Sequence, residues 1–100
     1  MQNFFGGMPR SMRQSVPLAD DNVNLINNIR TDIMGELDAI NQYTVHINQT
    51  TNPQMQKVWK NIRSEEEVHV GELMNMLFKL NPESYENFKK GIEESNDLTK

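Results

Sequence analysis

The sequence predicts an all-α protein in which two long helices form an antiparallel hairpin and a short third helix follows. Apolar residues recur at alternating steps of three and four over two long segments, and this spacing places them on one face of a helix. The prolines lie outside or at the first position of these segments and never inside them. Only 36% of the 100 residues are hydrophobic, so we expect a second copy to complete a four-helix bundle.

Composition excludes several classes of function. The chain has no cysteine, which excludes disulfide scaffolds, thiolate metal sites, iron–sulfur clusters and thiol nucleophiles. Its formal net charge of −4 argues against nucleic acid or an anionic membrane surface as the main partner. No apolar run is long enough to span a membrane or to act as a signal peptide. We therefore expect a cytoplasmic protein with no membrane and no nucleic-acid partner.

The first long helix is expected over about residues 21–49, after a Gly-, Pro- and Met-rich segment (1–19) that we expect to be a flexible tail. Asp20 or Asp21 can cap its start, because a short side-chain acceptor satisfies free amides in the first helical turn. Its stripe consists of Ile26, Ile29, Ile33, Glu36, Ile40, Tyr43 and Ile47.

The second long helix is expected over about residues 53–80. Thr51 or Asn52 can cap it, and Pro53 suits the first helical position. Its stripe consists of Met55, Trp59, Ile62, Glu66, His69, Leu73, Met76 and Leu80. Asn81-Pro82 repeats the cap-and-proline pattern and predicts a third helix over about 83–92, which completes a folded unit of residues 20–93. The polar residues 94–100 are expected to fray.

Three ionisable side chains interrupt the two apolar stripes. Glu36 and Glu66 are nearly equidistant from the turn at residues 50–52, so the antiparallel hairpin places them level with each other. His69 follows Glu66 by three residues and therefore shares its helix face. Burying an unpaired carboxylate costs several kcal/mol, so these groups must be neutralised, paired or bound to a cation.

A separate Glu together with a Glu-x-x-His motif is half of the ligand set of a carboxylate-bridged di-metal site. Two copies of this chain would supply the full set of four Glu and two His from four helices. Carboxylate and imidazole ligands without thiolate suit iron or manganese and accept zinc. The competing interpretation is structural: Glu36 would form a buried salt bridge with Arg63 or Lys60, and His69 would be a core histidine.

Three segments of the sequence resemble the encapsulated ferritins, which are short ferritin-like proteins associated with encapsulin nanocompartments. These are Gly35 to Tyr43, the Thr51-Asn52-Pro53 break and Arg63 to His69. The resemblance implies that two hairpins meet in a ferritin-like bundle with a ferroxidase site between them, and that five such dimers form a ring-shaped homodecamer. Iron is oxidised there and stored by the surrounding encapsulin shell.

The resemblance also assigns roles to particular residues. Glu36, Glu66 and His69 would be the di-iron ligands, Tyr43 would lie beside the site, and Asp38 would help to draw metal toward it at an entry site. Gly35 departs from the family pattern, because members can carry a further acid there, and Gln42 stands where they can carry Trp. The polar residues 97–100 do not resemble an encapsulin-targeting peptide.

These observations predict an enzyme that oxidises Fe(II) to Fe(III) in iron storage or detoxification. Two alternatives stay open at this point. One is a helical adaptor oligomer without catalytic activity, whose acidic residues are paired or bind a structural ion. The other is a different di-metal enzyme of the ferritin-like class that uses manganese or consumes peroxide, because these ligand types do not separate iron from manganese.

Overall fold

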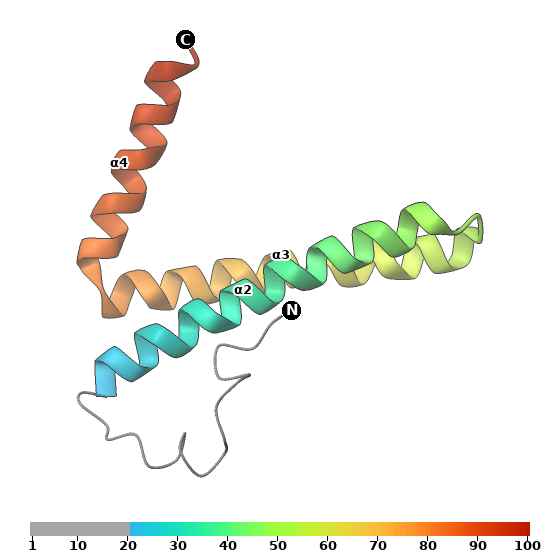
Figure 1. The fold of residues 1–100 in the computed structure, drawn as a ribbon, viewed down its shortest axis with the longest axis horizontal. Helices are drawn as coiled ribbons and strands as arrows, with labels where there is room; N and C mark the ends of the chain where they lie inside the picture. The colour runs from blue at the N-terminus through green and yellow to red at the C-terminus, as the bar shows by residue number, and fades with distance from the viewer. Residues whose placement is uncertain (1–20) are drawn as a thin grey trace, which may run out of the picture.

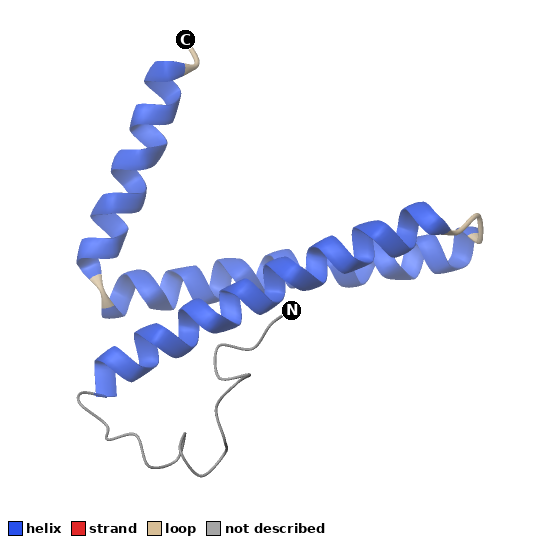
Figure 2. Cartoon of the chain, in the orientation of Figure 1, coloured by secondary structure: helices blue, strands red, loops and turns tan. Residues whose placement is uncertain are grey.

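Residues 21–100, which a computed structural model describes, form three helices and contain no strand. Helices α2 (Asp21–Gln49) and α3 (Pro53–Leu80) run antiparallel and side by side, while α4 (Pro82–Leu98) leaves the far end of α3 in a different direction (Figures 1 and 2). The predicted all-α class is confirmed. The predicted tail over residues 1–19 and the candidate cap Asp20 lie outside the described residues.

The turn between α2 and α3 is held by side-chain hydrogen bonds. The Oδ1 atom of Asn52 accepts from the backbone N–H groups of Gln54 at 3.0 Å and Met55 at 3.1 Å. Pro53 occupies the first helical position, where its missing N–H costs nothing. Gln56 Nε2 donates to the carbonyl oxygens of Ile47 at 3.3 Å and Thr50 at 2.7 Å. These bonds tie the first turn of α3 to the end of α2, and so they set the register of the hairpin.

The hairpin has a thin core. Among the described residues the buried hydrophobic side chains are Ile33, Ile47 and Leu77, with exposed fractions of 9%, 6% and 2%. The α2 stripe predicted from the sequence does face α3, and its members are buried or half-buried. On α3 the buried face differs from the predicted stripe. The stripe includes Met76, which is 45% exposed, whereas its neighbour Leu77 is buried.

The outer edge of the α3 stripe is open. Met55, Ile62, His69 and Met76 follow one another every seven residues, so they lie on one line along the helix. All of them are exposed except Ile62, which is half-buried. Thirteen large hydrophobic side chains between residues 21 and 100 are exposed in all. Apolar side chains that gather on a protein surface often mark a site of interaction with another protein.

Helix α4 is joined to α3 by a capped corner. Asn81 Nδ2 donates to Ser84 Oγ at 2.9 Å, and the backbone N–H of Asn81 donates to the carbonyl oxygen of Leu77 at 2.8 Å. The ring of Phe78 packs edge-on against Tyr85 and Phe88, with 5.4 Å between ring centroids in each pair. These contacts fix the base of α4, and the rest of the helix extends from it (Figure 1).

The end of α4 corrects the expectation from the sequence. The helix runs to Leu98, six residues beyond the predicted end at residue 92, so residues 94–98 are helical. This segment contains no proline, and Glu93 and Glu94 are good helix formers, so its polarity does not stop the helix. The end comes at Thr99, whose N–H and Oγ1 both donate to the carbonyl oxygen of Ser95.

Across residues 21–100, no helix combines the length and the apolar character that a membrane-spanning segment needs.

The Asn52 cap gives a direct stability prediction. Replacing Asn52 with Ala removes the acceptor for two backbone N–H groups, and loss of such a cap typically costs about 1 kcal/mol. We expect the thermal midpoint, followed by circular dichroism, to fall by about 4–8 °C. Asn52→Asp keeps the acceptor and should stay close to the native midpoint. An unchanged midpoint in Asn52→Ala would show that the cap does not stabilise the hairpin.

Candidate metal centre

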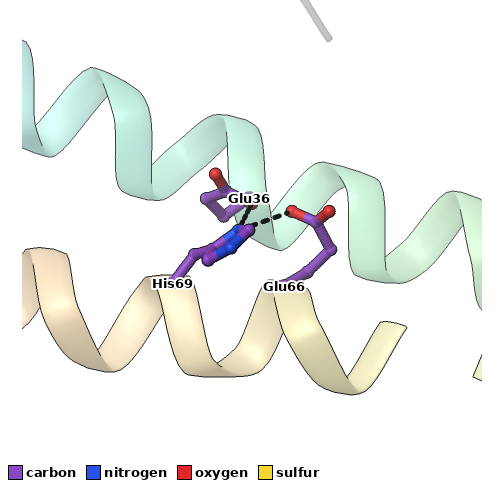
Figure 3. A group of neighbouring side chains, drawn as sticks. All are labelled: Glu36, Glu66 and His69. Carbon is purple, nitrogen blue, oxygen red and sulfur yellow. Dashed lines mark ion pairs between the residues drawn. The ribbon is translucent and has the colours of Figure 1, made fainter. Parts of the chain in front are cut away.

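The three ionisable residues predicted from the sequence converge at the middle of the hairpin. Glu36 comes from α2, and Glu66 and His69 come from adjacent turns of α3 (Figure 3). The Nδ1 atom of His69 lies 3.6 Å from Glu36 Oε2 and 3.6 Å from Glu66 Oε2. One ligand atom from each residue lies within 4.8 Å of the other two. The hairpin register therefore places both carboxylates beside one imidazole.

The group is asymmetric in its exposure to solvent. The side chains of Glu36 and Glu66 are 26% and 18% exposed, whereas that of His69 is 49% exposed. The two acids are thus less exposed than the imidazole, which points toward both of them (Figure 3). A ligand set that is half open in this way leaves coordination positions for further donors.

The alternative that Glu36 forms a salt bridge with Arg63 or Lys60 is wrong. Arg63 Nη1 donates to Thr44 Oγ1 at 3.0 Å, and Thr44 Oγ1 donates in turn to the carbonyl oxygen of Ile40 at 2.8 Å. Over residues 21–100 neither Arg63 nor Lys60 forms an ion pair with Glu36. Within residues 21–100, the ion-pair partner of both carboxylates is His69.

The donor atoms fit a transition-metal ion. Two donors bound to one such ion at about 2.1 Å lie about 3–4 Å apart, depending on the angle between the bonds. The 3.6 Å separations from His69 Nδ1 to each carboxylate fall in this range. Two carboxylates and an imidazole, with no thiolate, suit Fe(II) or Mn(II) and accept Zn(II). Small side-chain rotations would bring all three donors onto one ion.

An open depression of about 590 Å³ gives access to the two acids. Small residues create it, because Gly35 and Ala39 leave room beside Glu36. Asp32, which is not among the predicted site residues, also lines the depression one helical turn before Glu36. Its spacing of four residues from Glu36 is the signal that could have identified it. The remaining lining residues are Thr31, Glu66 and Leu73.

The two other residues named by the resemblance lie apart from the cluster. Tyr43 is two helical turns beyond Glu36, and its ring packs against His46 with 6.2 Å between centroids. His46 in turn lies 5.3 Å from Trp59, so these three rings form a separate aromatic group toward the turn. Asp38 is half-buried on α2 and is not among the residues that line the depression.

A pair of histidine variants tests the metal centre. His69→Ala removes one of three donors, and we expect its affinity for Mn(II), measured by calorimetry, to fall at least about tenfold. His46→Ala is the matched control, because it removes an exposed histidine that belongs to the aromatic group instead. Equal affinities in the two variants would show that His69 is not a ligand.

No protein-family model matches the chain. Individual proteins do match it. The chain is 37% identical over 75 residues to the ferritin-like-encapsulin shell fusion protein of Pyrococcus furiosus. This match covers 75% of the chain and 22% of the fusion protein. The chain is 31% identical over 84 residues to the encapsulin nanocompartment cargo protein EncC of Myxococcus xanthus, covering 84% of this chain and 65% of that protein. The chain thus spans about a fifth of the first relative and just under two thirds of the second.

The fold has a counterpart among solved structures. The crystal structure of the encapsulated ferritin domain from Pyrococcus furiosus superposes with a TM-score of 0.79 at 33% sequence identity. The match covers 85% of this chain and 87% of that one. The sequence and structural similarities agree, so the chain belongs to the encapsulated ferritin family.

Proposed function

We propose that this protein is a ferroxidase that oxidises Fe(II) to Fe(III) at a di-iron site shared between two chains. The observation that carries the proposal is the convergence of Glu36, Glu66 and His69 on one point of the hairpin. These residues are half of the four-Glu, two-His set that binds two metal ions in ferritin-like proteins. Membership of the encapsulated ferritin family supports the same chemistry.

A second copy of the chain would supply the other half of the ligand set. His69 is half exposed and lies on the open edge of α3 together with Met55 and Met76. Pairing two hairpins through this edge would bury the apolar side chains and bring the two ligand sets together in one four-helix bundle. Burial of the stripe and completion of the site thus require the same dimer, and we extend the proposal to a ring of five such dimers.

Each residue of the site has a distinct proposed role. Glu66, the less exposed of the two acids, and its counterpart from a second chain would hold both irons, and Glu36 and His69 would each bind one iron. Tyr43 supports the site from two turns away as a hydrogen-bond donor or electron donor, and Asp38 attracts Fe(II) toward it. Two Fe(II) ions lose one electron each, and dioxygen or peroxide accepts both. The protein contributes the ligand geometry and a partly dehydrated pocket.

The proposal includes a compartment. The relatives are named as an encapsulin shell fusion protein and as encapsulin cargo proteins. We propose that this chain likewise acts inside an encapsulin shell in the cytoplasm, where the shell stores the Fe(III) that the site produces. Between residues 21 and 100 the site lies in an open depression of about 590 Å³, so on this proposal a surrounding container would supply the storage volume.

Iron oxidation tests the catalytic part of the proposal. We expect anaerobic Fe(II) titration to saturate near one iron per chain, and exposure to air to give rapid oxidation, measured by near-ultraviolet absorbance. Glu36→Ala should abolish the rapid phase, because each dimer would lose two carboxylate ligands. Glu67→Ala is the control, since Glu67 is exposed and lies outside the ligand group.

Two results would contradict the proposal in different ways. Slow oxidation at equal rates in the native protein and in Glu36→Ala would favour a non-catalytic helical adaptor. Preferential binding of Mn(II) with peroxide consumption, and without iron oxidation, would favour a different di-metal enzyme.

A charge placed on the open edge of α3 tests whether the site is shared. Met76→Arg should leave the hairpin folded, because Met76 is already 45% exposed. It should prevent pairing, so sedimentation should show single chains and the rapid oxidation phase should be lost. Val45→Arg is the matched control at a 50% exposed position in the last two turns of α2, away from the site, and should keep both properties. An active single chain would contradict the shared site, and a paired, fully active Met76→Arg protein would show that the chains do not pair through this edge.

A further inference from the structure

A half-buried arginine lies next to the metal centre without an acidic partner. Arg63 precedes Glu66 by three residues on α3, so the two are neighbours on the helix surface. Among residues 21–100 Arg63 forms no ion pair. Its Nη1 atom donates instead to Thr44 Oγ1 at 3.0 Å, across the hairpin. A positive charge thus contacts a neutral hydroxyl, although two carboxylates lie close by on the same hairpin.

This arrangement is contrary to the ordinary preference of an arginine side chain. A guanidinium group carries its N–H donors in a fork that matches a carboxylate, and such a charge-assisted pair is stronger than a bond to a neutral hydroxyl. Glu66 is within the reach of Arg63, because residues three apart on a helix can form an ion pair. The contact with Thr44 therefore directs Arg63 away from its natural partner.

Thr44 is fixed in the orientation that accepts from Arg63. Its Oγ1 atom donates to the carbonyl oxygen of Ile40 at 2.8 Å, so the hydroxyl hydrogen is already used and the oxygen lone pairs are left for the guanidinium. Thr44 is half-buried, and its bond to Ile40 selects one χ1 rotamer of this β-branched side chain. The acceptor is therefore in place whether or not Arg63 contacts it.

The hydrogen bond draws the guanidinium toward the turn and away from the two acids. Thr44 follows Glu36 by eight residues, which is about 12 Å along the helix axis. Arg63 is displaced from Glu66 in the same direction by three residues, or about 4.5 Å. Charges in contact at about 4 Å attract each other strongly, whereas a separation greater than the Debye length of about 8 Å leaves a much weaker interaction.

We propose that Thr44 is a positioning residue of the metal centre, which holds Arg63 away from Glu66 and so keeps both carboxylates free for a divalent cation. Without the hydroxyl, Arg63 turns to Glu66, and a cation has to displace the guanidinium before it can bind there. The affinity of the site then falls in proportion to the fraction of chains whose carboxylates are free. The inference rests on the proposed function in so far as the cation is Fe(II).

Calorimetric titration with Mn(II) tests the role of the hydroxyl. Thr44→Val keeps the β-branched shape and removes the acceptor, and we expect the affinity to fall about fivefold, as an ion pair of ordinary strength would cause. Thr44→Ser keeps the hydroxyl and should bind like the native protein. Ser64→Ala is the matched control, because it removes an exposed hydroxyl that donates to the carbonyl oxygen of Lys60. Unchanged affinity in Thr44→Val would overturn the proposal.

A second substitution separates this role from general damage to the hairpin. Arg63→Gln removes the competing charge, so adding Thr44→Val to Arg63→Gln should cause no further loss of Mn(II) affinity. If the double variant binds about fivefold more weakly than Arg63→Gln alone, the hydroxyl acts without the guanidinium and the proposal is wrong.

Nuclear magnetic resonance of the metal-free protein distinguishes this proposal from the ferroxidase. In the native protein we expect nuclear Overhauser contacts between the guanidinium protons of Arg63 and the methyl group of Thr44. In Thr44→Val, contacts between Arg63 and the Glu66 side chain should appear, and their absence would overturn the proposal. If they appear but the native protein neither binds Mn(II) nor oxidises iron, the proposed function fails while the positioning of Arg63 by Thr44 stands.

Discussion

The structure depends on two carboxylates that one helical hairpin holds at the same level. Glu36 and Glu66 are recessed between α2 and α3, and among the described residues their only charged or chargeable contact is His69. Like charges at short distance in a partly dehydrated setting repel each other, and a bound cation relieves that repulsion. The Asn52 turn and the Gln56 bridge fix the register that enforces this proximity. Local capping interactions at one end of the hairpin thereby determine the chemistry at its middle.

The same hairpin does not bury all of its own apolar side chains. Ile33, Ile47 and Leu77 are its buried hydrophobic residues, while Met76 and Val58 stay about half exposed. Two helices have only one mutual interface, so the second edge of each stripe has nothing to cover it. Glu36, Glu66 and His69 lie at this boundary between the covered and the open edge. Under the proposed function, one partner chain would both cover the open edge and complete the ligand set.

Much of the fold and of the candidate site follows from spacing and capping alone. The alternation of three- and four-residue steps predicted both long helices, and the turn predicted that Glu36 and Glu66 would lie level. For α3, periodicity does not tell which of two neighbouring apolar residues is buried. Packing against α2 buries Leu77 and leaves Met76 exposed. Polarity does not predict the end of α4, because the polar residues after Ile92 contain no proline and the helix continues through them to Leu98. The bond between Arg63 and Thr44 has no sequence signature, since it depends on the distance across the hairpin.

If the half-exposed His69 is a ligand of a shared site, its loss has a consequence when intact and damaged chains mix. If every site draws its ligands from two chains, a chain that lacks His69 disables each intact chain with which it pairs. In a random mixture the fraction of fully equipped sites then falls as the square of the fraction of intact chains. Damage to a minority of chains, for example by oxidation of the exposed imidazole, would thus reduce capacity more steeply than in a protein whose sites lie within single chains. Rapid exchange of subunits would spread this effect, whereas a closed and slowly exchanging assembly would confine it.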